Sequence, residues 1–471
     1  MSAIGAKDSN DHFHSLYVGF SVQKRIVIIG AGPTGIGAAY RLNELGHNSW
    51  DIYEQNDYLG GLAASFTDDE GFVWDIGGHV VFSHYDYFDR YVDAVLGGDY
   101  LSHERRSFIR IYDRWVPYPF QNNIRYLPKK IVLECLVGLF EASRDSHPSS
   151  NFREWIDAVF GRGIARHFMV PYNNMAWKFP LEKMSKEWIA ERVSVIDFER
   201  VLGNVLLERD DVAWGPNSRF RFPLKGGTGA MFEGYRQHIK GHLHLNHRLV
   251  ALDLNTKTLE FQNGERTTFD SLLTTIPLDE LAAITRGAPD AVRDATSNLG
   301  VTAGVMVGLG FRKPCPSDKC WMYFPEDNSP FYRVTYFSNY SPNNVPDVRS
   351  HHSLVCEVSC QPSELDDVAR TAVESTLDGL IASDLITPQD VNDLVSTRVI
   401  KLSHSYPVPT IDRNKHLRTV LEFFESHNIL SRGRFGGWRY EIGNTDHSFM
   451  QGKEAIDRIL LGRPEQVWTE L

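Results

Sequence analysis

The stretch that decides the fold is RIVIIGAGPTGIGAAYRLNELG, residues 25–46. A β-branched apolar run ends at Gly30, and Gly30, Gly32 and Gly35 have the G-x-G-x-x-G spacing before a helix-forming segment. Glycine here permits a sharp turn and lets a pyrophosphate lie against bare backbone at a helix N-terminus. The next strand-like run ends in Glu54, where a carboxylate can accept hydrogen bonds from a ribose diol. These features predict a Rossmann-like dinucleotide-binding unit.

Two further glycine doublets bear on which dinucleotide is bound. Gly60 and Gly61 follow the acidic residue closely, and Gly77 and Gly78 precede His79. A simple nicotinamide dehydrogenase has no need of glycines there, whereas bulky side chains would block a flavin lying along this segment. Each doublet taken alone is also compatible with an ordinary turn. Together they favour FAD over NAD.

Length and charge limit the classes of function. The chain has 471 residues, 42% of them hydrophobic and 23% charged, with a net charge of −11. This length supports two or three domains with cores of their own. The negative charge argues against a nucleic-acid or anionic-membrane partner, so phosphates must be bound by a few placed arginines. Residues 1–22 are polar and lack the apolar core of a signal peptide, which predicts a disordered lead-in.

The longest apolar run is IVLECLVGLF, which begins at Ile131. Because Glu134 interrupts it and it is too short to span a bilayer, a buried helix is expected and no membrane partner. Five cysteines without a secretory signal fit a reducing compartment, which predicts a cytoplasmic location. A zinc site from the pairs at 315/320 and 356/360 is the alternative, but neither pair has C-x-x-C spacing, so no metal is expected.

The order of strand-like and helix-like segments predicts an α/β fold: a Rossmann-like FAD-binding domain with a helical insertion and an antiparallel β-sheet insertion. After about residue 243, alternating strands with turns predict a β-meander whose end rejoins the nucleotide-binding sheet. The expected divisions are a lead-in at 1–22, a discontinuous FAD-binding domain at 23–108, 219–300 and 400–465, a helical domain at 124–212, and a β-sheet substrate domain at 109–123 and 301–399.

Several strings dense in polar and aromatic residues narrow the family. They are GGHVVFSHYDYF, WVPYPFQNN, PYNNMAWKFP, ERV at 191–193, WGPNSRFRFPLKGGTGA, KCWMYFPEDNSPFYRVTYFSNYSP, YPVPT and GRFGGWRYEIGNTDHSF. This set, in this order, resembles the eukaryotic-type UDP-galactopyranose mutases, within the superfamily of amine oxidases and protoporphyrinogen oxidase. The resemblance runs from about Arg25 to the C-terminal helix. Between Pro346 and Leu354 the chain is shorter than fungal members, which leaves the oligomeric state open.

The resemblance implies a redox-neutral ring contraction that interconverts UDP-galactopyranose and UDP-galactofuranose. Reduced flavin N5 attacks the anomeric carbon and expels UDP, and the resulting flavin N5–sugar adduct opens and recloses as the other ring form. Negative charge grows on the departing diphosphate, so arginines aimed at it stabilise the transition state. The cofactor is expected to act as reduced FAD. NAD(P)H is possible as reductant, but it would have to use the same cleft, because no second nucleotide fingerprint is present.

By resemblance, the expected catalytic residues are Arg192, Arg333, His79 and Arg434. The expected cofactor-binding residues are Gly30, Gly32, Pro33, Thr34, Gly35, Glu54, Gly60, Gly61, Leu62, Gly78, His79, Arg434, Asn444, Asp446 and Ser448. The expected residues for the UDP-sugar are Tyr118, Phe120, Gln121, Asn173, Trp177, Arg192, Asn217, Trp321, Tyr323, Arg333, Tyr340, Tyr406, Tyr440 and Asn444.

Structural roles are the alternatives for several of these residues. Arg333, inside the strand-like FYRVTYF, could form an ion pair that only stabilises the fold, and His79 could simply be packed. Asn444 and Asp446 precede the last helix and could cap it. Aromatic residues are usually in the core, and this is the alternative for Phe120.

Three other functions remain open at this point. The same chemistry could act on another UDP-sugar, such as an arabinopyranose, a uronic acid or an N-acetyl sugar. An FAD-dependent oxidase or desaturase would need an apolar or aromatic cage rather than two diphosphate arginines. A flavin-bound scaffold without chemistry would not need the four expected catalytic residues together.

Overall fold

The computed structural model describes residues 23–144, 148–189, 197–212 and 218–468. The expected lead-in at 1–22 lies outside the described residues. So do two of the expected site residues, Arg192 and Asn217.

A parallel five-stranded sheet forms the centre of the nucleotide-binding region, in the order β20-β13-β1-β2-β9. Its strands are β1 Ile26–Ile29, β2 Trp50–Tyr53, β9 Leu243–His244, β13 Ser271–Thr274 and β20 Ile429–Ser431. All four residues of β1 are buried, as expected of a central strand covered on both faces. The predicted Rossmann-like sheet is confirmed.

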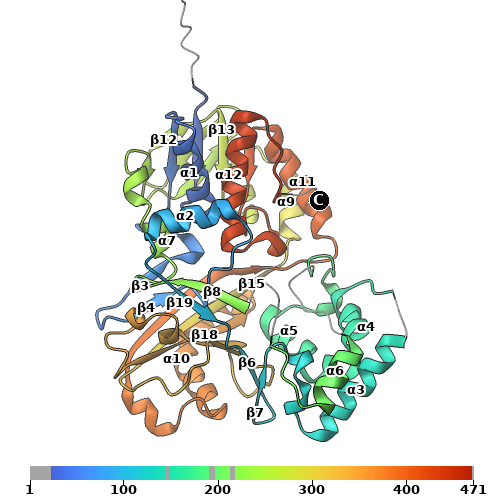
Figure 1. Cartoon of the computed structure of the whole chain (residues 1–471). Coiled ribbons are helices and arrows are strands. Elements are labelled where there is room, and N and C mark those ends of the chain that lie inside the picture. The colour runs from blue at the N-terminus through green and yellow to red at the C-terminus, as the bar shows by residue number, and fades with distance from the viewer. Residues whose placement is uncertain (1–22, 145–147, 190–196, 213–217, 469–471) are drawn as a thin grey trace, which may run out of the picture.

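Two helices from opposite ends of the chain, α1 Pro33–Glu44 and α12 Thr445–Leu461, lie against each other beside this sheet (Figure 1). Glycines allow their close approach. A Cβ atom on Gly37 would lie 2.1 Å from the Phe449 carbonyl oxygen, and one on Gly452 would lie 1.8 Å from the Thr34 carbonyl oxygen. The N-terminal half of α1 therefore packs directly against α12.

Replacing Gly452 by alanine is expected to lower the free energy of unfolding by about 1–3 kcal/mol, because the added methyl group forces the two helices apart. The matched control is Gly203→Ala in α6 Phe198–Leu206, where nothing lies within 4 Å of the new Cβ. That change should be neutral or stabilising, since alanine favours a helix over glycine. Urea unfolding of both variants is the measurement. Equal stabilities for the two would contradict the close approach of α1 and α12.

The predicted β-meander is present and leads back into the parallel sheet. Strands β10 Leu249–Asp253, β11 Thr258–Phe261 and β12 Arg266–Thr268 pair in antiparallel fashion, and the chain then enters β13. The short strand β14 Thr285–Arg286 pairs parallel with β10.

A second large sheet has seven strands in the order β19-β15-β18-β17-β16-β6-β7. Their bounds are β6 Phe108–Ile111, β7 Arg114–Pro117, β15 Val301–Phe311, β16 Trp321–Tyr323, β17 Arg333–Tyr336, β18 His352–Cys360 and β19 Leu394–Pro407. Every pairing is antiparallel except that of β16 with β6. The helix α10 Leu365–Ala382 packs against this sheet (Figure 1). The strand β19 runs across the expected boundary at 399/400. The expected division into domains stays a prediction.

Helices form a separate lobe beside the second sheet (Figure 1). They are α3 Lys129–Arg144, α4 Phe152–Ile164, α5 Val170–Trp177 and α6. The apolar run from Ile131 forms a helix as predicted, but the helix is buried on one face only. Leu133, Val137 and Phe140 of α3 are 62%, 48% and 44% exposed, because only the opposite face of the helix packs into the lobe.

The remaining elements are short or connect these regions. They are α2 Asp86–Leu96, α7 Ala230–Glu233, α8 Leu278–Ile284, α9 Asp290–Ser297, α11 Arg413–Ser426, β3 Ser65–Thr67, β4 Val73–Asp75, β5 Tyr100–Glu104 and β8 Arg219–Pro223. All five cysteines are free thiols. In the parts of the chain that are described, no helix combines the length and apolar character needed to cross a bilayer.

Candidate functional site

A cavity of about 760 Å³ opens at the carboxyl ends of the parallel strands, where the loop after β1 meets the N-terminus of α1. The expected cofactor residues that line it are Gly30, Gly32, Pro33, Thr34, Glu54, Gly61, Leu62, His79, Arg434 and Ser448. Ligands of doubly wound folds bind at this edge of the sheet. The cavity therefore lies where the glycine motif predicts it.

Glycines leave the floor of this cavity without side chains. A Cβ on Gly61, whose φ is +52°, would lie 3.2 Å from the Cα of Gly32. Gly32 is the N-cap of α1, and Pro33 at the first helical position costs the helix no hydrogen bond. Bare backbone at a helix N-terminus fits the pyrophosphate of FAD.

Two of the expected cofactor glycines act from behind the cavity. A Cβ on Gly35 would lie 1.9 Å from the Gly30 carbonyl oxygen, so glycine is needed for the packing of strand against helix. The Gly60 N–H donates to the Ala31 carbonyl oxygen at 2.9 Å and ties the two glycine loops together. Both residues shape the cavity without lining it.

Glu54 directly follows β2, and its side chain is buried. Oε2 accepts a hydrogen bond from the Ala31 N–H at 2.8 Å, and Oε1 accepts from the Asn56 N–H and side chain at 3.0 and 2.7 Å. Burial raises the pKa of Glu54 despite these donors. The carboxylate faces the cavity at the position where a ribose diol is expected.

A second cavity of about 370 Å³ adjoins the first, and His79, Arg434 and Thr445 line both. The expected site residues that line it are Gly78, His79, Tyr118, Gln121, Asn173, Trp177, Trp321, Tyr323, Arg333, Tyr406, Arg434, Tyr440, Asn444 and Asp446. The structure thus brings together residues from the glycine doublet, the helical lobe, the second sheet and the C-terminal segment.

Two expected substrate residues within the described part of the chain do not line this cavity. Phe120 is fully buried and stacks on Phe168 with ring centroids 4.5 Å apart. Tyr340 is also fully buried, between the rings of Phe220 and Phe222, each 5.2 Å away. Both aromatic rings gain more from burial in the core than from exposure at the cavity wall.

Arg333 on β17 is held by Glu357, which faces it on β18. Arg333 Nε donates to Glu357 Oε1 at 2.5 Å, and Nη2 donates to Oε2 at 2.6 Å. The Glu357 side chain is 2% exposed, whereas that of Arg333 is 24% exposed and lines the cavity. Burial acts to raise the pKa of Glu357, but the guanidinium charge and the hydrogen bonds hold it below its usual range. Arg333 therefore combines its alternative role, a stabilising ion pair, with a position at the cavity.

Two tyrosines extend this pair along the wall of the cavity. The Tyr332 hydroxyl donates to Glu357 Oε2 at 2.7 Å and lies 2.9 Å from the hydroxyl of Tyr406. The Gly78 N–H donates to Glu357 Oε1 at 3.2 Å. A single carboxylate therefore joins an arginine, a tyrosine and the second glycine doublet.

Sequence reasoning missed several lining residues: Arg105, Phe168, Met169, Tyr172, Trp188 and Tyr332. Arg105 lies over the rings of Tyr118 and Trp321, with distances of 4.3 and 4.9 Å from its Cζ to the ring centroids. Glu357, behind the wall, was missed as well. Its signal is a lone acidic residue within the otherwise uncharged strand HSLVCEVSC.

His79 lies at the junction of the two cavities. Burial lowers the pKa of its imidazole to about 4, and the charge of Arg434 acts in the same direction. The ring is therefore neutral near pH 7, and its Nδ1 is buried with no hydrogen-bond partner among the described residues. The residue lines both cavities, while its buried Nδ1 lies toward Gly77, 3.9 Å from the position that a Cβ would take there.

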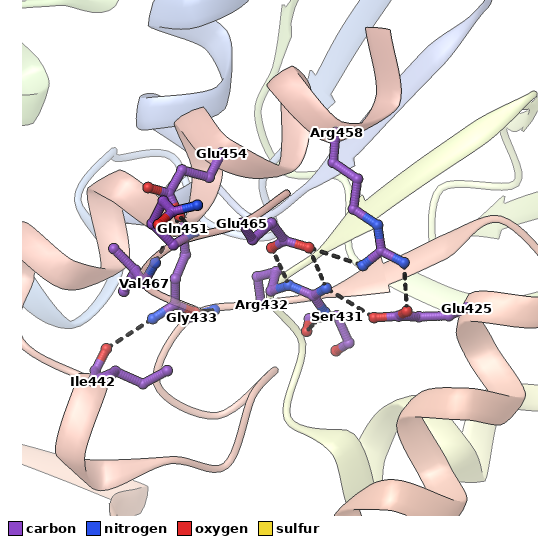
Figure 2. Close-up of polar contacts among 11 residues, drawn as sticks. Glu425, Ser431, Arg432, Gly433, Ile442, Gln451, Glu454, Arg458, Glu465 and Val467 are labelled. Atoms are coloured by element: carbon purple, nitrogen blue, oxygen red, sulfur yellow. Dashed lines mark hydrogen bonds and ion pairs between the residues drawn. The ribbon is translucent and has the colours of Figure 1, made fainter. Parts of the chain in front are cut away.

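Arg434 is positioned by a network at the start of the C-terminal segment. Gln451 on α12 accepts a hydrogen bond from the Gly433 N–H and donates to the Ile442 carbonyl oxygen, each at 2.8 Å (Figure 2). Arg434 Nε donates to the Gly443 carbonyl oxygen at 3.1 Å. These contacts fix both loops on either side of the Arg434 side chain.

A buried charge network supports the same segment. The guanidinium of Arg432 is fully buried and pairs with Glu425 and Glu465, and Arg458 bridges the same two carboxylates (Figure 2). Because Arg432 immediately precedes Gly433, this network anchors the loop that carries Arg434 to α12. Truncating one partner of such a pair would leave an uncompensated buried charge.

Asn444 is the N-cap residue of α12, and Asp446 lies in its first turn. Asp446 Oδ2 accepts the His84 N–H at 3.2 Å and lies 2.8 Å from His84 Nδ1, while Oδ1 lies 3.0 Å from His447 Nδ1. The carboxylate is buried at the cavity edge. Among the described residues, these three side chains alone group donors as a metal site would. Their hydrogen bonds to one another already account for the arrangement.

Comparison with known proteins agrees with this geometry. Residues 33–366, well over half of the chain, match the family model described as flavin containing amine oxidoreductase. The parallel sheet, the glycine-floored cavity and this match define an FAD-dependent flavoprotein, as the sequence predicts.

A crystal structure of reduced UDP-galactopyranose mutase is similar over nearly the whole chain. It has a TM-score of 0.90 and 43% sequence identity, and the match covers 94% of this chain and 95% of that one. The chain therefore belongs to the flavin-containing amine oxidoreductases and, within them, to the UDP-galactopyranose mutases. The expectation of an FAD-dependent isomerase is confirmed.

More distant proteins share only the fold or a short segment. A structure of a putative protoporphyrinogen oxidase from Exiguobacterium sp. 255-15 has a TM-score of 0.71 at 18% identity, covering 93% of this chain and 99% of that one. A zeta-carotene desaturase of Capsicum annuum is 38% identical over 71 residues, which are 15% of this chain and 12% of that protein. Neither similarity bears on the substrate.

Proposed function

We propose that the FAD-loaded, reduced protein interconverts UDP-galactopyranose and UDP-galactofuranose without net redox change. The observation that carries this proposal is the second cavity, which adjoins the cofactor cavity and contains Arg333 held by a buried carboxylate. When bound, reduced FAD supplies its N5 as the nucleophile that forms a covalent adduct with the anomeric carbon. The protein supplies placement and charge.

Arg333 binds the diphosphate of the substrate. Its Nε and Nη2 are occupied by Glu357, which fixes the guanidinium plane while part of the side chain lines the cavity. The hydroxyls of Tyr323, Tyr406 and Tyr440 surround the same cavity and can donate to phosphate oxygens. Donors held in place before the reaction stabilise the charge that develops on UDP as it leaves.

The remaining lining residues form two groups, one that can contact the uridine and one that lies beside the flavin. Tyr118 and Trp177 offer rings for the uridine, and Gln121 and Asn173 offer amides that can bind its polar edge. Arg434, at the junction of the cavities, places a cation beside the flavin and favours its anionic reduced form. By family resemblance, Arg192 acts as a second diphosphate ligand and Asn217 contacts the substrate; both lie outside the residues that the structure describes.

The test is to incubate protein, either oxidised or reduced with dithionite, with a panel of UDP-sugars and to separate the products by chromatography. Reduced protein is expected to convert UDP-galactofuranose, whereas oxidised protein is not, because only reduced N5 is nucleophilic. Trapping with cyanoborohydride should yield a joined flavin–sugar species, detected by mass spectrometry. Equal turnover in both redox states would contradict the flavin nucleophile.

The panel also distinguishes the sugar. UDP-arabinopyranose, a UDP-uronic acid and a UDP-N-acetyl sugar share the nucleotide contacts with UDP-galactose. The first two differ from it at C5 and C6, and the N-acetyl sugar differs at C2. Turnover of one of these in preference to UDP-galactofuranose would reassign the substrate and keep the chemistry. Reduction by NADH or NADPH in place of dithionite identifies the reductant in the same assay.

A further inference from the structure

Glu357 touches both halves of the site although it lines neither cavity. Its carboxylate accepts two hydrogen bonds from Arg333, one from the Tyr332 hydroxyl and one from the Gly78 N–H. Arg333 faces the substrate cavity, and Gly78 directly precedes His79, which faces both. The carboxylate is therefore a short physical link between the nucleotide-binding arginine and the loop next to the cofactor.

The surroundings of this link leave it little freedom. The Glu357 side chain is 2% exposed, in the middle of a strand paired on both sides. On the other side of the contact, a Cβ on Gly78 would lie 2.7 Å from Thr335 Oγ1 and 3.3 Å from Glu357 Oε1. A shift of the carboxylate is thus passed to the Gly78 amide, because packed interiors transmit small displacements.

We propose that Glu357 is a positioning residue that couples nucleotide binding at Arg333 to the flavin through Gly78 and His79. This inference rests on the proposed function and deepens it. A diphosphate bound to Arg333 competes with Glu357 for the guanidinium. The carboxylate then strengthens its hold on its other donors, Tyr332 and the Gly78 N–H, and the adjoining His79 moves relative to the flavin edge.

The measurement is the response of the flavin to UDP, not turnover. In FAD-loaded wild-type protein, saturating UDP is expected to shift both the flavin absorption spectrum and its midpoint potential. Glu357→Gln removes the charge and replaces one acceptor oxygen by an NH₂ group, so at saturating UDP both responses should fall at least about fivefold, as expected when one coupling element is lost. FAD stoichiometry should stay at the wild-type value.

A second variant keeps the test decisive if Glu357→Gln folds poorly. Glu357→Asp preserves the charge but withdraws the oxygens by about 1.5 Å, the length of one C–C bond. The weakest contact, that with the Gly78 N–H at 3.2 Å, is the first to be lost. This variant should bind UDP and yet show the reduced flavin response.

The matched control is Glu454→Gln. Glu454 is also a buried carboxylate, 6% exposed, and accepts the N–H groups of Gln466 and Val467 away from both cavities. It should keep the wild-type response to UDP. A full-sized response in both Glu357 variants would overturn the coupling.

Turnover and UDP binding of the wild-type protein distinguish failure of the coupling from failure of the proposed function. Wild-type protein that turns over UDP-sugars but shows no flavin response to UDP would overturn the coupling and leave the mutase assignment intact. Wild-type protein that neither binds UDP nor turns over UDP-sugars would overturn both.

Discussion

Arg333→Ala is expected to lower kcat/KM at least about 30-fold, which corresponds to about 2 kcal/mol, the order of loss for truncating one partner of a desolvated charge pair. The physical reason is the charge that develops on the departing diphosphate, which the fixed guanidinium stabilises more than it stabilises bound substrate. The same change should also lower the free energy of unfolding by about 3–5 kcal/mol, because it leaves the buried Glu357 carboxylate uncompensated. Steady-state kinetics of reduced enzyme and urea unfolding measure the two effects.

Paired variants separate the two losses. In Arg333→Gln combined with Glu357→Gln, neither buried charge remains, so stability should return toward wild type while activity stays low. Arg333→Lys keeps the charge but cannot reproduce the bidentate geometry, and an intermediate activity is expected. Arg349→Ala is the control, since Arg349 is 87% exposed and pairs only locally with Asp347 among the described residues. A loss of activity below about threefold in Arg333→Ala would contradict the diphosphate role.

The nucleotide-binding half could be predicted because its signals are local. The glycine spacing after β1, the proline at the first turn of α1 and the acidic residue after β2 all lie within about thirty residues and are set by backbone geometry. At Gly30 and Gly35, glycine is required by the backbone turn or by a close approach, and the structure confirms this requirement. The return of the meander into β13 follows from the same pattern rules.

The substrate half depends on contacts between distant segments, which periodicity does not encode. Glu357 accepts a hydrogen bond from the Gly78 N–H, 279 positions away in the sequence, and no motif near either residue indicates this contact. Most of the residues that the family strings point to line the second cavity, since whole motifs carry over together. They could not tell which way a ring points, and so Phe120 and Tyr340 were assigned to the cavity although both lie in the core.

The exposed face of α3 shows a different limit of prediction from sequence. An apolar run of ten residues covers all sides of a helix, and the sequence does not say which side packs. In the structure Val132, Cys135 and Leu139 are buried, while the opposite side stays exposed. Burial is decided by the neighbouring helices rather than by the run itself.

Gly61→Val is expected to yield protein that purifies with less than about a tenth of the wild-type flavin content. The new Cβ would lie 3.2 Å from the Gly32 Cα and would fill the bare floor on which the pyrophosphate has to rest. Valine also resists the left-handed conformation at φ +52°, at a cost of about 1–3 kcal/mol. Flavin absorbance per protein, before and after incubation with added FAD, measures the outcome.

The control must share the backbone strain without the steric block. Gly46 has φ +62°, and nothing lies within 4 Å of the position that a Cβ would take there, so Gly46→Val imposes a similar conformational cost in open space. It should lose stability but retain its flavin. If both variants lost flavin equally, strain alone would explain the effect, and if Gly61→Val kept its full flavin content, the glycine floor would not be the pyrophosphate site. If Gly61→Val alone loses flavin, the loss is caused by the valine side chain in the pyrophosphate site, because a general weakening of the fold would affect both variants.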